Sequence, residues 1–334
     1  MSGARQLTAL GVRFDLGAPV LHAANVADSV VFATGDGRFH RVHGEDSEAL
    51  PGHAGVSLSS CGHPNGFALS GGDDGRVLRV SAKGVEEVAA FGRDWPNAIA
   101  VAPQTGLTAI SAGKRLHVFD AAFQQVAVFE HPHTVGGVAF DPKGKRVVAS
   151  HYGGVSVRMA ANPDASARVL AWKGSHIAVT WSPCGRFIIT SMQENAIHGW
   201  RLEDSQHFRM DGYPQRVRSL DWLDRGRKLA TTGAGAEVLL WPFVGPKGPM
   251  GKAAEALSSP AETDAMILAA RPNAATAAVG YRDGSVRLFN LMPPAGFTLE
   301  PAAGAAVSAL TWTHEDAILA YGREDGTAGL VRVS

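Results

Sequence analysis

Apolar and polar residues alternate in short runs along the chain, and glycine-containing turns separate the runs. One run, G-Y-R-D-G-S-V-R-L-F-N at 280–290, places apolar Val286 and Leu288 on either side of Arg287, directly after an Asp-Gly turn. Alternation with a period of two is typical of a half-buried β-strand, and Asp-Gly between two such strands is typical of a tight hairpin. Similar phrases predict further hairpins at 35–42, 71–80 and 322–333.

A second recurrent pattern lies upstream of the hairpins. It reads V-G-G-V-A-F-D-P-K-G-K-R-V-V-A-S at 135–150 and returns at 177–191, 217–232 and, weakened, 307–320. Each copy is an apolar run, a short turn and a second apolar run, which predicts two paired strands. Together the patterns predict a unit of strand, turn, strand, Gly-rich turn and strand, followed by a less regular segment that can form a fourth strand.

The hairpin turns recur at a nearly constant interval. They fall near Asp36, Asp74, Lys114, Gly153, Glu194, Gly235, Asp283 and Asp325. These are eight positions separated by 38 to 48 residues. A period of roughly 40–45 residues with four strands per unit is typical of the blades of a β-propeller.

The chain resembles the WD40-repeat family of β-propellers over almost its whole length. The Trp-Asp that ends the third strand in that family corresponds here to Phe119-Asp120, Phe289-Asn290, Trp200-Arg201 and Trp241-Pro242. The family's Gly-His before the first strand is literal at Gly52-His53. No unit joins that histidine to a hairpin Asp and a strand Trp, so we expect the family's buried hydrogen-bonded tetrad to be missing and apolar packing to hold the blades.

The predicted architecture is all-β: a single WD40-like β-propeller domain spanning 1–334. The eight hairpins favour eight blades of four antiparallel strands, and seven blades is the alternative because the family most often has seven. The last unit has three strands, whereas L-T-A-L-G-V-R-F-D-L-G at 7–17 reads as a strand ahead of the first unit. The resemblance implies that this N-terminal strand completes the last blade and closes the ring.

Composition narrows the class of protein. Lys plus Arg and Asp plus Glu are both 31, so no global charge favours nucleic acid or an anionic membrane surface. The N-terminus has no apolar run of signal-peptide length, and no later segment is long enough to span a membrane. Cys61 and Cys184 are the only cysteines and form no C-x-x-C pair. We expect a cytoplasmic monomer without a disulfide framework.

Several of the 13 histidines fall in loops of one face. In a propeller, the loops entering each first strand and the turns between second and third strands share one face, here named the top face. His131, His133, His151 and His176 belong to adjoining units on it, and imidazoles at such spacing suit zinc. The alternative is that these are pre-strand histidines bonded to backbone. His40, His117 and His198 occupy one repeat position on different blades, so we expect them on solvated strands, pointing apart.

Other top-face loops offer residue types that are favoured in protein interfaces. They are Trp95, Arg93, Asp94, Met192, Glu194, Tyr281 and Arg282. Trp95 is the main candidate for a partner contact, and its alternative role is packing between adjacent blades.

The resemblance implies a non-catalytic scaffold that binds a protein or peptide partner through its top-face loops. The alternative function is an accessory role in transition-metal (zinc) homeostasis. An enzyme is disfavoured because the first strands are small and apolar and no nucleophile has a base nearby. Residues 244–252 (V-G-P-K-G-P-M-G-K) lack the spacing of a phosphate loop. They belong to an insertion, 244–262, that we expect to be a flexible loop or a partner-binding strap.

Overall fold

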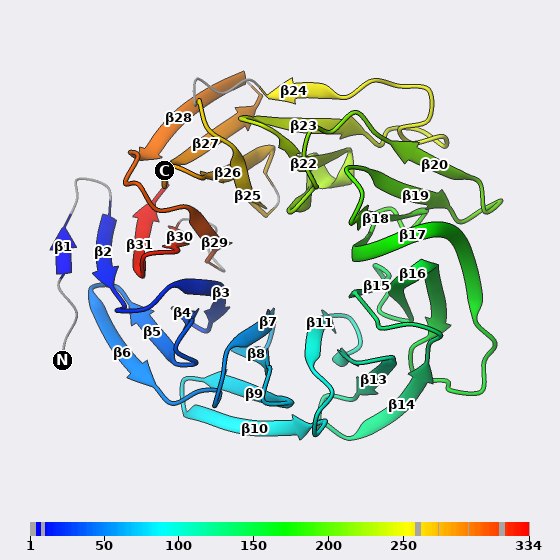
Figure 1. Ribbon diagram of the computed structural model, residues 1–334, viewed down its shortest axis with the longest axis horizontal. Coiled ribbons are helices and arrows are strands. Elements are labelled where there is room, and N and C mark those ends of the chain that lie inside the picture. Colours follow the sequence, from blue (N-terminus) through cyan, green and yellow to red (C-terminus); the bar gives the residue numbers. More distant parts are fainter. Residues whose placement is uncertain are drawn as a thin grey trace.

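The computed structural model describes residues 5–7, 11–257, 262–272, 274–292, 294–313 and 318–333. Its strands form seven hydrogen-bonded sheets arranged in a ring, which Figure 1 shows from one end. The chain runs once around the ring, and β2 at its start lies beside β31 at its end (Figure 1). The fold is an all-β propeller, as the repeat period predicts.

The strands follow the repeat units in chain order. The first three units are β3 (Val20–Val26), β4 (Ser29–Thr34), β5 (Phe39–His43) and β6 (Asp46–Leu50); β7 (Ser57–His63), β8 (Phe67–Gly72), β9 (Arg76–Ser81) and β10 (Gly84–Ala90); β11 (Pro96–Ala102), β12 (Leu107–Ala112), β13 (Arg115–Phe119) and β14 (Gln125–Glu130). The fourth and fifth units are β15 (Gly137–Phe140), β16 (Arg146–Met159), β17 (Arg168–Trp181), β18 (Phe187–Met192), β19 (Ile197–Arg201) and β20 (His207–Met210).

The remaining units lead back to the start of the ring. The sixth and seventh are β21 (Leu220–Leu223), the 3-10 turn η1 (Asp224–Gly226), β22 (Lys228–Ala234), β23 (Glu237–Pro242) and β24 (Glu255–Leu257); β25 (Ala265–Ala270), β26 (Thr276–Tyr281), β27 (Val286–Leu291) and β28 (Pro294–Glu300). The last sheet contains β29 (Val307–Trp312), β30 (Ile318–Arg323), β31 (Thr327–Arg332), β2 (Gly11–Asp15) and β1 (Arg5–Leu7).

The fourth and fifth units share one six-stranded sheet, β15 to β20. The 14-residue strand β16 folds back on itself. Its two ends meet where the Ala160 amide donates a hydrogen bond to the Lys145 carbonyl at 2.9 Å. The 14-residue strand β17 pairs with β16 through its first half and with β18 through its second half. Counted as hydrogen-bonded sheets of the described residues, the ring therefore has seven blades, the alternative number, although eight repeat units are distributed over them.

The Asp-Gly turns have the geometry that their sequence predicts. Asp36, Asp74, Asp283 and Asp325 each accept a hydrogen bond from the backbone amide two residues further on, at 2.9–3.3 Å. The glycine between them has a φ of 76° to 91°, a left-handed conformation that costs glycine little. The recurrent Asp-Gly phrase is therefore a hairpin turn in which the aspartate side chain, in place of a backbone carbonyl, accepts the hydrogen bond from a backbone amide.

The N-terminal strand closes the ring. β2 pairs antiparallel with β31, from Gly11 opposite Val331 to Asp15 opposite Thr327, which confirms the predicted closure. Residues 8–10 of the predicted strand lie outside the described residues. β1 adds a further strand on the outer edge of β2, which the sequence did not predict.

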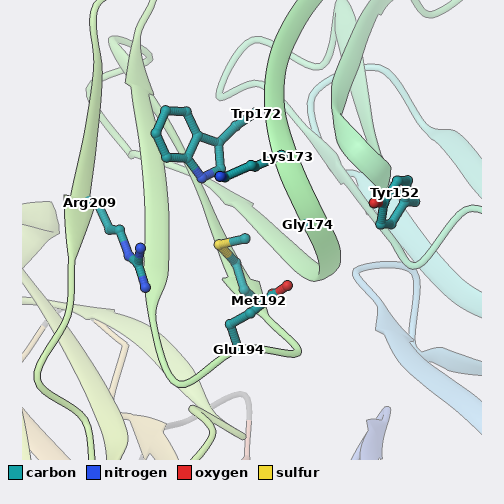
Figure 2. A pocket seen from close by; sticks show the side chains of 7 residues that line it. All are labelled: Tyr152, Trp172, Lys173, Gly174, Met192, Glu194 and Arg209. Atoms are coloured by element: carbon teal, nitrogen blue, oxygen red, sulfur yellow. The ribbon is translucent and has the colours of Figure 1, made fainter.

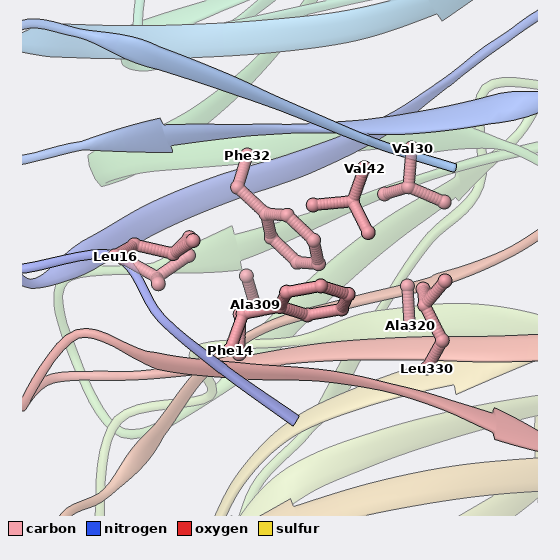
Figure 3. Packing of buried hydrophobic residues seen from close by; sticks show 10 residues of the cluster. Phe14, Leu16, Val30, Phe32, Val42, Ala309, Ala320 and Leu330 are labelled. Carbon is pink, nitrogen blue, oxygen red and sulfur yellow. The ribbon is translucent and has the colours of Figure 1, made fainter. Parts of the chain in front are cut away.

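Apolar side chains fill the space between neighbouring sheets. At the closure, Phe14 and Leu16 pack with Val30, Phe32 and Val42 of the first unit (Figure 3). Ala309, Ala320 and Leu330 of the last unit complete the same cluster. Each blade thus depends on its neighbours for burial, as expected of a repeat architecture.

Polar side chains of the innermost strands join one unit to the next. The Ser59 hydroxyl donates to the Pro96 carbonyl at 2.7 Å, and the Asn97 side-chain amide donates to the Val135 carbonyl at 3.0 Å. These bonds satisfy backbone groups at the inner edges of the sheets, where no further strand pairs. Among the described residues, the fold contains no helix that is long and apolar enough to cross a membrane.

Candidate functional site on the top face

A buried hydrogen-bonded network underlies the top face of the second unit. His53 Nδ1 lies 3.0 Å from Asp74 Oδ1, and His53 Nε2 lies 3.0 Å from the Ser70 hydroxyl. We expected the family's hydrogen-bonded tetrad to be missing. Its tryptophan is absent from this unit, but its histidine, aspartate and serine are joined by hydrogen bonds. Burial opposes ionisation of Asp74, but amide bonds from Ala54 and Arg76 outweigh it and lower its pKa to about 2.

Asp74, His53 and Ser70 are hydrogen-bonded in the same order as the Asp, His and Ser of a hydrolytic triad, but a substrate cannot reach the serine. Ser70 is 2% exposed and His53 is 6% exposed, and the Ser70 hydroxyl also bonds the Ser57 hydroxyl at 2.8 Å. A nucleophile must reach a substrate, so these residues support the turn and do not catalyse. In the sixth unit Tyr213 takes the position before the first strand, with its hydroxyl 2.8 Å from Thr231 and 2.7 Å from Trp241 Nε1.

Two of the four histidines predicted to bind zinc have both ring nitrogens engaged. His176 bonds the Thr190 hydroxyl at 2.7 Å and the Trp172 carbonyl at 3.0 Å. His151 bonds the Tyr152 carbonyl at 2.8 Å and the Ser156 hydroxyl at 2.9 Å. Both side chains are buried, and burial lowers the pKa of His176. Such hydrogen bonds to nearby backbone and hydroxyl groups agree with the alternative interpretation, in which these are pre-strand histidines that hold their own turns.

The other two histidines do not complete a ligand set. His131 is buried, its ring centroid lies 5.7 Å from that of His151, and burial followed by the proximity of His151 lowers its pKa to about 4. His133 is exposed and lies edge-on to Tyr152 at 5.4 Å. Across the described ranges, no group of three or more His, Cys, Asp or Glu side chains is arranged to hold a metal ion.

The predicted partner residues of the loop before β11 lie at the surface. Trp95 is 58% exposed, so it does not pack between blades. Arg93 is exposed and forms no ion pair with the other described residues, whereas Asp94 accepts a hydrogen bond from Arg115 at 2.7 Å. The exposed indole of Trp95 beside the exposed Arg93 side chain is available for contact with another molecule.

Tyr281 and Arg282, both predicted to contact a partner, differ in exposure. Tyr281 is completely buried, so its prediction as a partner contact is wrong. It is the last residue of β26 and packs in the cluster between the sixth and seventh units, with Leu268 and Phe289. Arg282, the next residue, is exposed and forms an ion pair with Asp264 at 2.9 Å. Because successive side chains of a strand point to opposite faces, Arg282 points away from the core into which Tyr281 points.

Met192 and Glu194 belong to a hollow that we call the notch. Its volume is about 250 Å³, and its lining residues are Tyr152, Trp172, Lys173, Gly174, Met192, Glu194 and Arg209. It lies where β17 bends from the outer edge of the fourth unit into the fifth. Figure 2 shows Met192 directed toward Trp172, with Tyr152 across the β17 ribbon. Met192 is nevertheless 3% exposed, so it supplies a wall rather than a protruding contact.

The floor of the notch is a rigid aromatic stack. The Trp172 ring lies 4.3 Å from that of His198 at an interplanar angle of 17°, and 4.5 Å from that of His207. His198 is completely buried, and burial followed by the nearby His176 and His207 lowers its pKa to about 3. The prediction that His40, His117 and His198 lie on solvated strands is wrong, because all three are buried.

Sequence reasoning missed the notch residues Tyr152, Trp172, Lys173 and Arg209, although Tyr152 directly precedes the hairpin turn at Gly153. Their proximity depends on the β17 bend, where Gly174 has a φ of 118°. In the 244–262 insertion, Met250 and Ala254 pack on the core beside Trp241, and Lys252 donates to the Val244 carbonyl at 2.8 Å. Residues 258–261 of it lie outside the described residues.

Comparisons with known proteins agree with the fold. No family model matches the chain. It is 23% identical over 226 residues to telomerase protein component 1 of Mus musculus and 22% identical to that of Rattus norvegicus. The match covers 66% of this chain but 8% of each relative, so the chain spans a small part of their length. The crystal structure of the computationally designed Ika8 protein covers 96% of this chain and 98% of its own, with a TM-score of 0.74 and 18% identity. This likeness shows a β-propeller fold.

Proposed function

We propose that the chain is a non-catalytic, WD40-like propeller that binds a protein or peptide partner on its top face. The observation that carries the proposal is Trp95, a large apolar side chain that is 58% exposed on a loop held by rigid sheets. Trp and Arg are enriched among residues that dominate binding energy. The Asp-Gly hairpins and the buried His53 network support the WD40-like assignment.

The notch supports a specific partner chemistry. Lys173 is exposed and forms no ion pair within the part of the chain that the structure describes, and the Arg209 guanidinium lies 3.7 Å from the Asp211 carboxylate. Met192 and Trp172 provide apolar walls between these cations. A peptide with an apolar side chain next to an Asp or Glu fits this arrangement, because the apolar group fills the hollow and the carboxylate meets Lys173 or Arg209.

Affinity capture tests the proposal. Tagged wild-type protein is used to capture partners from cell extract, and the same is done with Trp95→Ala. The matched control is Phe297→Ala, which removes another exposed aromatic side chain, 53% exposed, from the outer strand β28. We expect Trp95→Ala to lose partners that wild type and Phe297→Ala retain. Equal capture by all three would refute a top-face site at Trp95.

A further inference from the structure

A second cavity, here called the bottom cavity, lies on the opposite face from the notch. It has a volume of about 500 Å³ and is surrounded by the turns that link first and second strands in the fifth, sixth and seventh units. Pro183 belongs to the first of these turns, Arg225 to the second and Arg271 to the third. These turns lie at the other ends of the strands from the hairpin turns. The size of the cavity suits a small organic molecule.

One wall of the bottom cavity carries a carboxylate that has no cationic partner. Asp221 Oδ1 accepts the Trp222 amide at 2.8 Å, and Oδ2 accepts the Ala270 amide at 2.9 Å. Among the described residues no Lys or Arg forms an ion pair with it. Burial raises the pKa of Asp221 although both amide bonds lower it. Each oxygen retains a lone pair that can accept a further hydrogen bond.

Two guanidinium groups line the same cavity, also without a carboxylate partner in the described part of the chain. Arg225 is exposed, and the nearby Asp224 carboxylate instead contacts Arg227 at 3.9 Å. Arg271 lies over the Trp312 ring at 5.3 Å, which holds its side chain in place without neutralising its charge. The cavity therefore has a cationic rim and an anionic wall that do not neutralise each other.

The frame around these groups is fixed. Trp222 donates from Nε1 to the Thr180 hydroxyl at 2.9 Å, and its ring packs edge-on to Phe243 at 4.8 Å. Gly226 approaches Pro183 so closely that an added Cβ would lie 2.7 Å from the proline ring. The turn before it keeps Asp224 and Arg225 at positive φ, 48° and 53°, which is uncommon for residues other than glycine. Because Asp221 and Trp222 are already held in place, their contacts with a ligand carry a small ordering cost.

We propose that the bottom cavity binds a small molecule that bears an anionic group and, a few atoms away, an ammonium or other hydrogen-bond donor. The anionic group, a carboxylate or a phosphate, pairs with Arg225 and Arg271. The donor bonds Asp221, whose buried carboxylate gains a charge or hydrogen-bond partner. Trp222 packs against the chain that links the two groups.

Calorimetric titration with defined probes tests this site. The bifunctional probes are O-phosphoethanolamine and β-alanine, which distinguish a phosphate from a carboxylate ligand, and the single-group probes are inorganic phosphate and ethanolamine. We expect at least one bifunctional probe to bind roughly tenfold or more tightly than either single-group probe, because it forms charged hydrogen bonds at both ends where a single-group probe forms them at one. No binding by either bifunctional probe, or equal binding by phosphate alone, overturns the proposal.

Two variants assign the contacts. Arg225→Ala changes an exposed side chain that has no hydrogen-bond partner among the described residues, so we expect the fold to stay intact and the bifunctional probe to bind roughly tenfold more weakly. Asp221→Asn is expected to remove the advantage of the bifunctional probe over phosphate. Undiminished binding by Arg225→Ala overturns the site independently of the folding of Asp221→Asn. Partner capture through Trp95 is measured in parallel, because it reports on the other face and its failure does not affect this site.

Discussion

Arg13 on β2 donates a hydrogen bond from Nε to the Glu300 carboxylate at the end of β28, at 2.9 Å, and so joins residues 287 positions apart. The Glu300 side chain is 2% exposed, and Arg323, equally buried, lies 3.8 Å from it. The strand that closes the ring is therefore held by an ion pair as well as by its backbone bonds to β31. This arrangement leads to the first prediction.

Glu300→Ala is expected to destabilise the ring by about 3–5 kcal/mol, because it leaves buried Arg323 without a carboxylate. Arg13→Ala is expected to cost less, since the Arg13 side chain is 26% exposed and water can replace part of its contact. The measurement is the free energy of unfolding from urea titration. An equal or smaller loss for Glu300→Ala would show that the buried pair does not stabilise the closure.

Phe14→Ala is expected to cost about 3–5 kcal/mol of unfolding free energy, because it empties the cluster where the first and last units meet. Met292→Ala is the matched control, since Met292 is 78% exposed and its loss should change stability by less than about 0.5 kcal/mol. Equal urea midpoints for the two variants would contradict the role of the closing cluster.

Acidification from pH 6.5 is expected to destabilise the fold through His131 and His198. Their folded pKa values, about 4 and about 3, lie below the usual value of 6.5, so the unfolded chain binds protons first. Stability from their burial is complete above pH 6.5, and each can lose about 1.4 kcal/mol per pH unit as the pH falls toward its folded pKa. Thermal melting between pH 7 and 5 checks this, with His198→Phe expected to flatten the slope.

Asp74 acts in a lower pH window. Its folded pKa of about 2 is below the usual 3.8, so its stabilisation is complete above about pH 4 and is lost as the pH falls through 2. The difference corresponds to about 2 kcal/mol. Asp74→Asn should therefore reduce the free energy of unfolding at pH 7 and remove part of the acid dependence below pH 4. A parallel acid dependence in wild type and variant would exclude Asp74 as its source.

Gly174→Ala is expected to close the notch. An added Cβ would lie 2.6 Å from the Met192 methyl group, at a φ of 118°. Gly212→Ala is the matched control, because Gly212 also has positive φ, 89°, but an added Cβ meets nothing within 4 Å. Binding of captured peptide segments with an acidic residue next to an apolar one should weaken in Gly174→Ala and persist in Gly212→Ala. Equal binding by both variants would remove the notch from the proposed interface.

The zinc interpretation has its own measurement. With both ring nitrogens of His151 and His176 engaged in hydrogen bonds, we expect purified, tag-free protein to contain no stoichiometric zinc and its melting temperature to be unchanged by a chelator. Mass spectrometry of the metal content checks this. Zinc that is lost on replacement of His131, His133, His151 and His176 would restore the metal-handling alternative.

The repeat units were predictable because local chemistry defines them. Asp283 and Gly284 specify a turn by themselves, and Val286 and Leu288 alternate with polar residues as a strand requires. The fusion of two units in one sheet was not predictable, because β17 continues through Gly174 from the fourth unit into the fifth, and such a glycine usually signals an interruption. Local pattern identifies turns but not whether neighbouring sheets remain separate.

The candidate site was harder to predict because it depends on what covers each strand. His198 alternates with apolar neighbours and reads as solvated, yet Trp172, from the bend of β17, covers it. Tyr281 reads as a loop residue, but it is the last residue of a strand that faces the next sheet. By contrast, the sequence left two roles open for Trp95, a partner contact and packing between adjacent blades, and its 58% exposure excludes the second.

The pairing of β2 with β31 also affects how the protein is synthesised. Phe14 leaves the ribosome before its strand partner Ala328, which is made more than 300 residues later. At about 5–20 residues per second, this interval is roughly 15–60 s. During that time Phe14 and Leu16 have no last blade to cover them, so the nascent chain carries an exposed apolar strand that other chains or chaperones can bind until β31 is made.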